Sequence, residues 1–475
     1  MKRLITTLTL LLLVVGITTA QRAKYVFYFI GDGLGINHIY GTELYNAAVH
    51  PQMPNQGRMS FSTFPLRTYI TNHSSSSLVT DSSAAGTALA SGVKTVNGYM
   101  GVDENLNSAK TIAELAAERG MKVGVATNVG VNHATPSAFF AHDKSRSNYL
   151  SLFEQLIASD VDFAAGSTIL HKRSGKTPAE LADVAREAGI EVVQDPQSAA
   201  KVENKRVLLL SPTLDEQALK YAVDCEETDP TIVDYTAAAI EYLERESDKN
   251  GFFLMVEAGH IDYCAHDNDA VTTFEEVNHL SESVQLALDF YAKHPKQTLI
   301  IVTADHETSG LSLGYKDYFM YPELLAYQRC SMVALTAKMR AMRDRGDISW
   351  QSMVELLKEE LGLWSKIELE AEDEKLTKEC FENDFVNTAT EVVSLYNHNE
   401  KLASVAIEVL NKRAKIKWVS LDHTGMQVPL YVKGAGLKYF GDCYDTAMMI
   451  TARDIYPDKY ERYMGSYERC KQYKR

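Results

Sequence analysis

The stretch TLIIVTADHE, residues 298–307, decides the fold class, because a run of apolar residues ends there in charged ones. Similar apolar runs are KYVFYFIG (24–31), RVLLLS (206–211) and GFFLMVEAG (251–259). Strands that are buried on both faces have this composition, and the helix-like segments between them indicate parallel crossovers. We therefore predict an α/β fold with a large central, mostly parallel sheet flanked by helices.

The stretch from about residue 315 to residue 417 has a different composition. It is rich in Glu, Lys, Leu and Met at helical spacing, as in SMVELLKEELGLW (352–364), and has almost no β-branched runs. Strand-like sequence returns in WVSLDHTG (418–425) and VPLYVKG (428–434). We predict one α/β domain, residues 21–475, with a helical insertion at about 315–417.

The first twenty residues resemble an export signal. Lys2 and Arg3 precede an apolar run, and small residues end the segment at Ala20. The run is shorter than the roughly 20 residues that a membrane-spanning helix needs. We predict a signal peptide, residues 1–20, and an exported protein, periplasmic or extracellular, with no membrane span in the mature chain.

Charge and cysteine content exclude some classes of function. The 475 residues include 63 acidic and 48 basic ones, for a formal net charge of −15. Nucleic-acid binding depends on a basic surface, so we expect no specific nucleic-acid binding. The six cysteines form no Cys-x-x-Cys pair, which argues against a zinc cage or a redox motif, and their spacing does not show which of them pair.

Polar side chains follow the predicted strands, and open α/β sheets bind ligands beyond the carboxyl ends of their strands. These side chains are Asp32, Glu257, Asp262, His266, Asp305, His306 and His423. Each of them alone is more often structural, as a turn residue, a surface pair or a core histidine. Together, at the ends of four predicted strands, they would crowd carboxylates unless cations lie among them. Mixed Asp and His ligands suit zinc, whereas carboxylate, hydroxyl and water ligands suit magnesium.

Two serines follow Asp81 in LVTDSSAAGTALASGVKT, residues 78–95. The simplest interpretation is a helix start, with Asp81 or Ser82 as the N-cap. A serine at a helix N-terminus beside metals would also meet backbone N–H groups that favour an anion. No Gly-x-Ser-x-Gly motif or His-Asp relay surrounds it, so activation of its hydroxyl by a metal is the more economical hypothesis.

Six motifs in one order carry a family resemblance. They are GDGLG, VTDSSAAGTALASGVKTVNGYMGVD, HATPSAFFAHDKSR, VEAGHIDYCAH, VTADHE and DHTG, spread from Asp32 to His423. In these motifs the chain resembles the alkaline phosphatases. The resemblance implies an alkaline phosphatase-like fold, and it says little about the helical stretch, where the family has variable insertions.

The resemblance also implies catalytic roles. Ser82, directly after Asp81, corresponds to the nucleophile, and it is counted among the metal ligands as well. Ser83 then occupies a neighbouring position that a small residue usually fills. Arg146 corresponds to the phosphate-binding arginine, which Asp81 would orient; its planar fork can bind two phosphate oxygens at once.

The cofactors that the resemblance implies are two Zn2+ ions and one Mg2+ ion. One zinc would be held by Asp262, His266 and His423, and the second by Asp32, Asp305 and His306. The third, magnesium-type site would be held by Asp32, Thr135 and Glu257, with His133 as a further ligand. His133 stands where some bacterial members have Asp, and Tyr263 stands where familiar members have Lys or His, so the identity of the third metal stays open.

The implied function is that of a secreted, metal-dependent phosphomonoesterase. It would release inorganic phosphate from small phosphate monoesters through a phosphoserine on Ser82. A sulfatase needs Cys or Ser followed by x-Pro-x-Arg, but Ser82 is followed by SAAG. The alternatives are a phosphodiesterase or mutase of the same superfamily and a non-catalytic protein that binds metal and phosphate. A homodimer is possible, because family members are often dimers.

Overall fold

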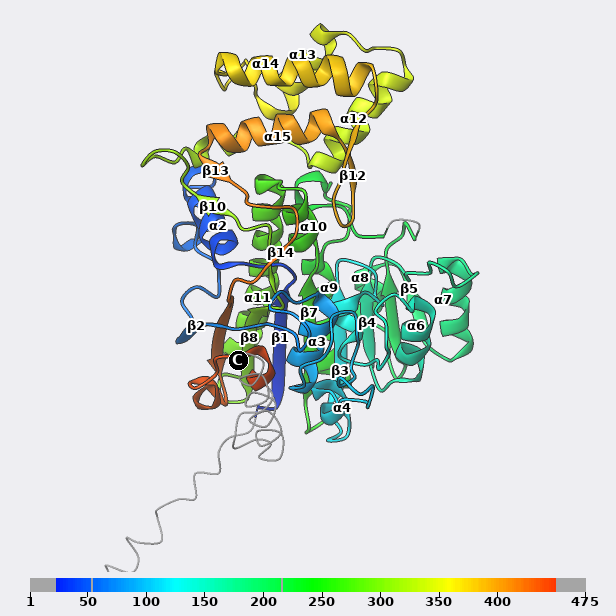
Figure 1. Ribbon diagram of the computed structural model, residues 1–475. Coiled ribbons are helices and arrows are strands. Elements are labelled where there is room, and N and C mark those ends of the chain that lie inside the picture. Colours follow the sequence, from blue (N-terminus) through cyan, green and yellow to red (C-terminus); the bar gives the residue numbers. More distant parts are fainter. Residues whose placement is uncertain (1–22, 53, 215–216, 450–475) are drawn as a thin grey trace, which may run out of the picture.

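The computed structural model describes residues 23–52, 54–214 and 217–449, whose arrangement Figure 1 shows. The predicted signal peptide, residues 1–20, and Cys470 lie outside the described residues. Within the described residues, the other five cysteines are free thiols. No helix in this part of the chain has the length and apolarity that crossing a membrane requires.

One nine-stranded sheet forms the centre of the molecule, in the order β2-β15-β8-β1-β7-β3-β4-β6-β5. Its strands are β1 (Tyr25–Gly31), β2 (Leu66–Ile70), β3 (Lys122–Thr127), β4 (Phe163–Gly166), β5 (Glu191–Val193), β6 (Val207–Leu210), β7 (Phe252–Ala258), β8 (Thr298–Ala304) and β15 (Val428–Gly434). β1 pairs in parallel with β7 and β8 along its whole length, whereas β15 runs antiparallel to both of its neighbours. The predicted large, mostly parallel sheet is confirmed.

Helices cover both faces of the sheet, which explains why its central strands are apolar. Every residue of β7 and β8 is buried. In Figure 1, α11 (Ala270–Lys293) lies behind the sheet and α3 (Ser82–Ser91) lies in front of it. The other helices around the sheet are α2 (Ile36–Val49), α4 (Ile112–Ala117), α5 (Ala134–Ser137), α6 (Tyr149–Ala158), α7 (Pro178–Glu187), α8 (Pro196–Ala200), α9 (Ile232–Glu246) and α10 (His260–His266).

A helical layer lies at one end of the molecule, at the top of Figure 1. It consists of α12 (Met332–Asp344), α13 (Trp350–Leu361), α14 (Ala371–Cys380) and α15 (Lys401–Arg413). Leu335, Leu357 and Phe274 belong to a second hydrophobic core, which therefore joins this layer to α11. The layer also contains a hairpin of β11 (Glu391–Val393) and β12 (His398–Glu400), which the helix-forming composition does not indicate.

The structure corrects one predicted strand. Residues 418–425 contribute only β14 (His423–Thr424), which pairs with β9 (Glu307–Thr308) outside the large sheet, so His423 is not at the end of a sheet strand. The backbone of this segment is bonded to a loop instead, because the N–H of Val419 donates to the carbonyl of Ser309. The strand-like residues 428–434 do form β15, which extends the sheet.

The strand directions bring the carboxyl ends of several strands, which polar residues follow, to one edge of the sheet. β2 and β8 both run antiparallel to β15, so β2 points the same way as β1, β7 and β8. The chain leaving β2 therefore reaches α3 at the edge where Asp32 and Asp305 follow their strands. In Figure 1, α10 and β14 lie between this edge and the helical layer.

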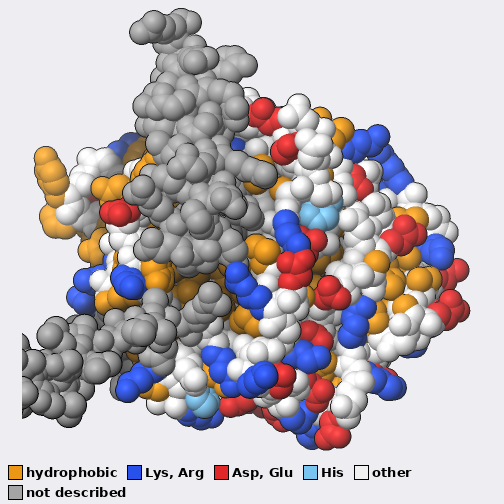
Figure 2. Space-filling view, turned by 90° about the horizontal axis from the view of Figure 1, so that it is seen from below, with side chains coloured by type: hydrophobic (Ala, Val, Ile, Leu, Met, Phe, Trp, Pro, Cys, Tyr) orange, Lys and Arg blue, Asp and Glu red, His pale blue; other side chains and the backbone are white. Residues whose placement is uncertain are grey.

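The opposite end of the molecule has a mixed surface. Figure 2 shows Lys and Arg side chains interspersed with Asp and Glu where described side chains are visible. The visible part of that face therefore carries no basic stripe of the kind that follows a phosphate backbone.

Candidate active site

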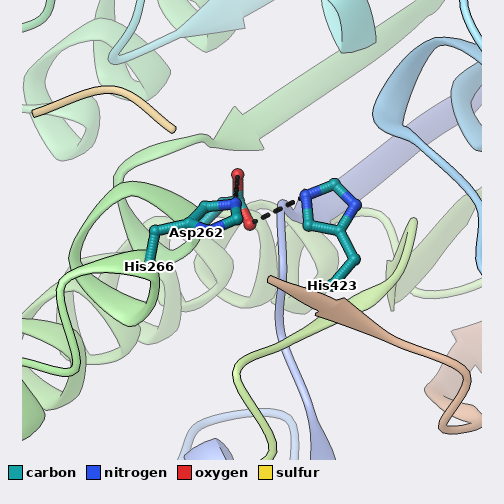
Figure 3. Close-up of side chains that lie close together, drawn as sticks. All are labelled: Asp262, His266 and His423. Carbon is teal, nitrogen blue, oxygen red and sulfur yellow. Dashed lines mark ion pairs between the residues drawn. The ribbon is translucent and has the colours of Figure 1, made fainter. Parts of the chain in front are cut away.

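The first candidate metal cluster consists of Asp262, His266 and His423. Figure 3 shows both imidazole rings beside the carboxylate of Asp262. His266 Nε2 lies 3.4 Å from Asp262 Oδ2, and His423 Nε2 lies 3.7 Å from Asp262 Oδ1. Asp262 and His266 are four residues apart on α10 and therefore share one helix face, while His423 comes from β14.

Backbone carbonyls orient both rings of this cluster. Nδ1 of His266 donates to the carbonyl of Leu421, and Nδ1 of His423 donates to the carbonyl of Thr80 at 3.0 Å. Because a carbonyl only accepts, each Nδ1 carries a hydrogen, so each Nε2 presents a lone pair when the ring is neutral. Both Nε2 atoms are buried without a hydrogen-bond partner. Metal-binding histidines are oriented in the same way, by a hydrogen bond from the second ring nitrogen.

Asp32, Asp305 and His306 form a second cluster at the ends of β1 and β8. His306 Nε2 lies 3.3 Å from Asp32 Oδ1 and 3.3 Å from Asp305 Oδ2. The N–H groups of Gly33 and His306 donate to Asp305 Oδ1 at 3.1 and 2.8 Å, which leaves Oδ2 for the cluster. Gly33 has a φ of 74°, and a Cβ there would lie 2.8 Å from Asp262 Oδ1, so the turn requires glycine.

The third cluster contains Asp32, His133, Thr135 and Glu257, all of them buried. Thr135 Oγ1 donates to Asp32 Oδ2 at 3.5 Å, and His133 Nδ1 lies 3.9 Å from Glu257 Oε1. Ligand atoms of Asp32, His133 and Glu257 all lie within 4.8 Å of one another. The structure thus brings the residues predicted for the third site together, and Asp32 links them to the second cluster.

Seven ligand atoms of these clusters are buried and have no hydrogen-bond partner. They are Asp32 Oδ1, His133 Nδ1, Glu257 Oε1, Asp262 Oδ2, His266 Nε2, Asp305 Oδ2 and His423 Nε2. Buried polar atoms in folded proteins are normally paired, because an unpaired one loses its hydration without compensation. Seven unpaired atoms in one place are typical of ligands that cations satisfy, and their chemistry fits zinc at the two His-containing clusters.

The carboxylates of the site repel one another. Burial, with the charges of Asp305 and Asp262, raises the pKa of Asp32 well above its usual value. Burial and the charge of Asp262 raise the pKa of Asp305 to about 7. Burial alone would also raise the pKa of Asp262, but His266 and His423 hold that pKa well below its usual value. Divalent cations among these groups would compensate the excess negative charge.

Ser82 is the first residue of α3, and its buried Oγ lies 3.2 Å from Nε2 of His306. The neighbouring Ser83 is turned away, because its Oγ donates to Asp81 Oδ2 at 2.7 Å. Asp81 is the N-cap of α3, and its Oδ1 accepts from the N–H of Ala84 at 3.0 Å. Of these two serines, Ser82 is therefore the one that faces the candidate metal ligands.

Arg146 connects the helix start to the third cluster. Its Nη1 donates to Asp81 Oδ2 at 3.3 Å, and its Nη2 donates to His133 Nε2 at 3.4 Å. Asp81 Oδ2 also accepts from the N–H of Gly98 at 3.0 Å, which holds the carboxylate in place. Burial alone would lower the pKa of Arg146, but the carboxylates of Asp81 and Asp32 raise it, so the guanidinium stays charged.

The structure places three side chains at the site that the sequence analysis did not name. Thr308 donates to Asp262 Oδ1, and Thr127 donates to Glu257 Oε2. Thr308 lies two residues after His306, and Thr127 is the last residue of β3, so their positions near a motif and at a strand end offered a signal. Tyr396 comes from the tip of the β11–β12 hairpin, in a stretch without any recognisable motif, and no sequence signal indicates it.

Comparison with known proteins gives one consistent result. A family model described as alkaline phosphatase matches residues 23–451. The chain is 30% identical to alkaline phosphatase 4 of Bacillus subtilis (strain 168) over 430 residues, covering 88% of this chain and 85% of that protein. It is 29% identical to alkaline phosphatase 3 of the same bacterium over 439 residues, covering 89% and 86%.

A solved structure extends the similarity to the fold. The cold-active alkaline phosphatase from a psychrophilic Shewanella species matches with a TM-score of 0.74 and 25% sequence identity. The match covers 90% of this chain and 98% of that chain. The similarity to that structure therefore extends over most of the chain.

Proposed function

Because this chain belongs to the alkaline phosphatase family, whose members are phosphoric monoester hydrolases, we propose that it releases inorganic phosphate from phosphate monoesters through a phosphoserine on Ser82. The observation that carries the proposal is the set of seven buried, unpaired ligand atoms in three adjoining clusters, one of which includes His306, whose Nε2 lies 3.2 Å from the Oγ of Ser82. An ordinary helix N-cap would not need such a set of atoms. We also propose that residues 21–475 form one domain, with an insertion at about 315–417.

Three metal ions would fit the three clusters. Asp262, His266 and His423 would hold one zinc, and Asp32, Asp305 and His306 would hold the second. Asp32, Thr135 and Glu257, with His133, would hold the third ion, which is magnesium where oxygen ligands dominate. When bound, the ions supply positive charge to the serine oxygen, the phosphate and the departing alcohol.

The protein itself would supply the nucleophile and the groups that bind the phosphate. The Oγ of Ser82 attacks phosphorus in line with the departing alcohol, and water later cleaves the Ser82–phosphate bond to release phosphate. Arg146 can bind two phosphate oxygens with its fork, while Asp81 holds the guanidinium in position. The N–H groups at the start of α3 favour the negative charge of the phosphate.

His133 and Tyr263 would tune the third metal site. Imidazole suits transition metals, whereas a carboxylate suits magnesium, so His133 favours zinc or weakens magnesium binding. Tyr263 contributes no positive charge, and its ring packs edge-on against His133 with the ring centroids 6.1 Å apart.

We further propose that the protein is exported to the periplasm or the extracellular space and acts there on small phosphomonoesters. The sequence of residues 1–20 supports export. The acidic net charge argues against nucleic acid as a partner. A homodimer would agree with the dimers that members of this family often form.

A phosphomonoester assay tests the proposed function. Purified protein is expected to hydrolyse a chromogenic phosphomonoester best at alkaline pH, because the metal ligands must lose protons before they bind metal. A chelator should abolish the activity, and zinc plus magnesium should restore it. Full activity in metal-stripped protein would contradict the proposal. Faster hydrolysis of a phosphodiester would favour a phosphodiesterase, and binding of metal and phosphate without turnover would favour a non-catalytic protein.

A further inference from the structure

The β11–β12 hairpin carries a tyrosine from the helical layer into the candidate active site. In Figure 1 this hairpin descends from the layer toward α10. The ring of Tyr396 stacks on Tyr263, with the centroids 3.6 Å apart and the planes at 17°. It also lies edge-on to His133 and His266, at centroid distances of 6.0 and 5.7 Å. Tyr396 therefore lies between the first and third metal clusters.

Arginines of α12 fix the base of the hairpin. Arg340 donates to Glu391 at 2.6 Å and to the carbonyl of His398 at 2.8 Å. Arg343 binds both carboxylate oxygens of Glu400, at 2.9 and 2.6 Å. Such forked arginine contacts give geometric specificity as well as binding energy. The helical layer thus holds both strands of the hairpin in place.

The tip of the hairpin is anchored separately, to residues outside the helical layer. Asn397 Nδ2 donates to Asp267 Oδ2 at 2.7 Å and to the hydroxyl of Tyr221 at 3.4 Å. Asp267 directly follows the candidate metal ligand His266 on α10. The residue next to Tyr396 therefore fixes the tip against the element that carries the first metal cluster.

The hydroxyl of Tyr396 is buried and has no hydrogen-bond partner. Among the described residues, Tyr235 is the other tyrosine whose hydroxyl is buried without a hydrogen-bond partner. Its whole side chain is buried in the main hydrophobic core. Tyr396 instead lies among polar groups, since it neighbours His133, to which Arg146 donates.

We propose that Tyr396 is a phosphate-binding residue whose hydroxyl donates a hydrogen bond to a phosphate oxygen beside Arg146. This inference rests on the proposed phosphatase function and adds to it a donor from the helical insertion. A phosphate group has unused acceptors, and the orphaned hydroxyl has an unused hydrogen. The same bond would form with the substrate and with the phosphate product, so it contributes to binding more than to the chemical step.

The test compares Tyr396→Phe with Tyr235→Phe in the metal-loaded protein. Both variants remove an orphaned buried hydroxyl and keep the ring, so the stack on Tyr263 survives. For Tyr396→Phe, we expect KM for a phosphomonoester and the inhibition constant of inorganic phosphate to rise together, by about tenfold, with kcat little changed. Tyr235→Phe should leave both constants as in the wild type.

A second readout does not depend on turnover. Inorganic phosphate should raise the melting temperature of the wild type and of Tyr235→Phe more than that of Tyr396→Phe, because ligand binding stabilises the folded state. Equal phosphate inhibition and equal phosphate stabilisation in Tyr396→Phe and the wild type would overturn the inference alone. A wild-type protein that neither hydrolyses phosphomonoesters nor binds phosphate would overturn the proposed function and this inference with it.

Discussion

Ser82 and Ser83 differ by one position at the start of α3, and that position decides which of them can react. The Oγ of Ser82 lies 3.2 Å from His306, whereas the Oγ of Ser83 donates to Asp81. Neighbouring residues of a helix point about 100° apart, so the two hydroxyls cannot exchange roles without moving the helix.

Replacing each serine by alanine tests this difference. Ser82→Ala should lower kcat by at least about a thousandfold, because the attacking atom is lost. Ser83→Ala removes one of several hydrogen bonds to Asp81 and should lower kcat/KM by less than about tenfold. Steady-state kinetics on both variants, with metal content matched, provide the measurement. Comparable losses in the two variants would mean that Ser82 has no special role.

The third metal site gives a second prediction at this scale. The double variant His133→Asp, Tyr263→Lys should need more magnesium for full activity than the parent, because a carboxylate and an ammonium replace an imidazole and a phenol. The phosphoserine step should persist. Magnesium activation curves of both metal-replete proteins measure the effect. Superimposable curves from two folded proteins would show that these positions do not control the site.

Three candidate ligands could be named from the sequence because they lie at strand ends in the chain, whereas the strand expected before His423 is wrong. Asp32, Asp305 and His306 follow β1 and β8 directly, so recognising the strand also locates the ligand. Tyr396 could not be named, since its place depends on contacts of Arg340 and Asn397 with distant residues. A side chain that long-range packing brings to a site leaves no local pattern.

At the scale of elements, the predictable strands are the continuously apolar ones. β1, β7 and β8 have seven residues each and lie at the buried centre of the sheet, and the four residues of β6 are Val and Leu only. β4 consists mostly of Ala and Gly, and β5 includes a charged Glu191, so their sequences carry little signal. The strand expected over residues 418–425 is wrong because that segment bonds to loops beside the site.

Two similar helix starts allow a pH test of one ion pair. α4 and α7 both begin with a Thr/Glu capping box, but only Glu114 of α4 also pairs with a histidine, His142, at 3.1 Å. The hydrogen bond to Glu114 raises the pKa of His142 above its usual 6.5. Burial alone would raise the pKa of Glu114, but His142 holds it below its usual 4.5. The pair is therefore fully charged and stabilising between pH 4.5 and 6.5.

We expect Glu114→Gln to lower the free energy of unfolding by about 0.5 kcal/mol at about pH 5.5 and by less at about pH 9, where His142 has lost its proton. The histidine contribution is lost as pH rises through its folded-state pKa, and the glutamate contribution is lost as pH falls through its own. Denaturant unfolding at the two pH values measures this. Glu180→Gln at the start of α7 is the control, and an equal pH dependence in both variants would refute the role of His142.

At the scale of the whole molecule, the site lies where two hydrophobic cores meet. The main core holds the sheet and its flanking helices, and the second core holds the helical layer on α11. Buried acidic groups between them must be compensated if the two cores are to stay packed together. Metal binding should therefore stabilise the entire fold and not only the site.

The stability of the metal-free protein should fall as pH rises from about 4 to about 9. Burial and Asp262 raise the pKa of Asp305 from 3.8 to about 7, so the folded state holds a proton there that the unfolded state releases. Burial alone would lower the pKa of His266, but Asp262 raises it to about 9, and its stabilising charge is lost above that value. Melting temperatures with chelator and with zinc plus magnesium, across this range, measure the effect. A metal-induced gain that does not grow with pH would contradict it.

The most direct test of the central claim is to locate the phosphate on the enzyme. The metal-loaded protein would be incubated with a labelled phosphomonoester, quenched during turnover, digested and analysed by mass spectrometry. The label is expected on the peptide that contains residues 78–95, at Ser82, and it should be absent after chelation or in Ser82→Ala. A label on Ser83, or full turnover without any phosphorylated serine, would contradict the account.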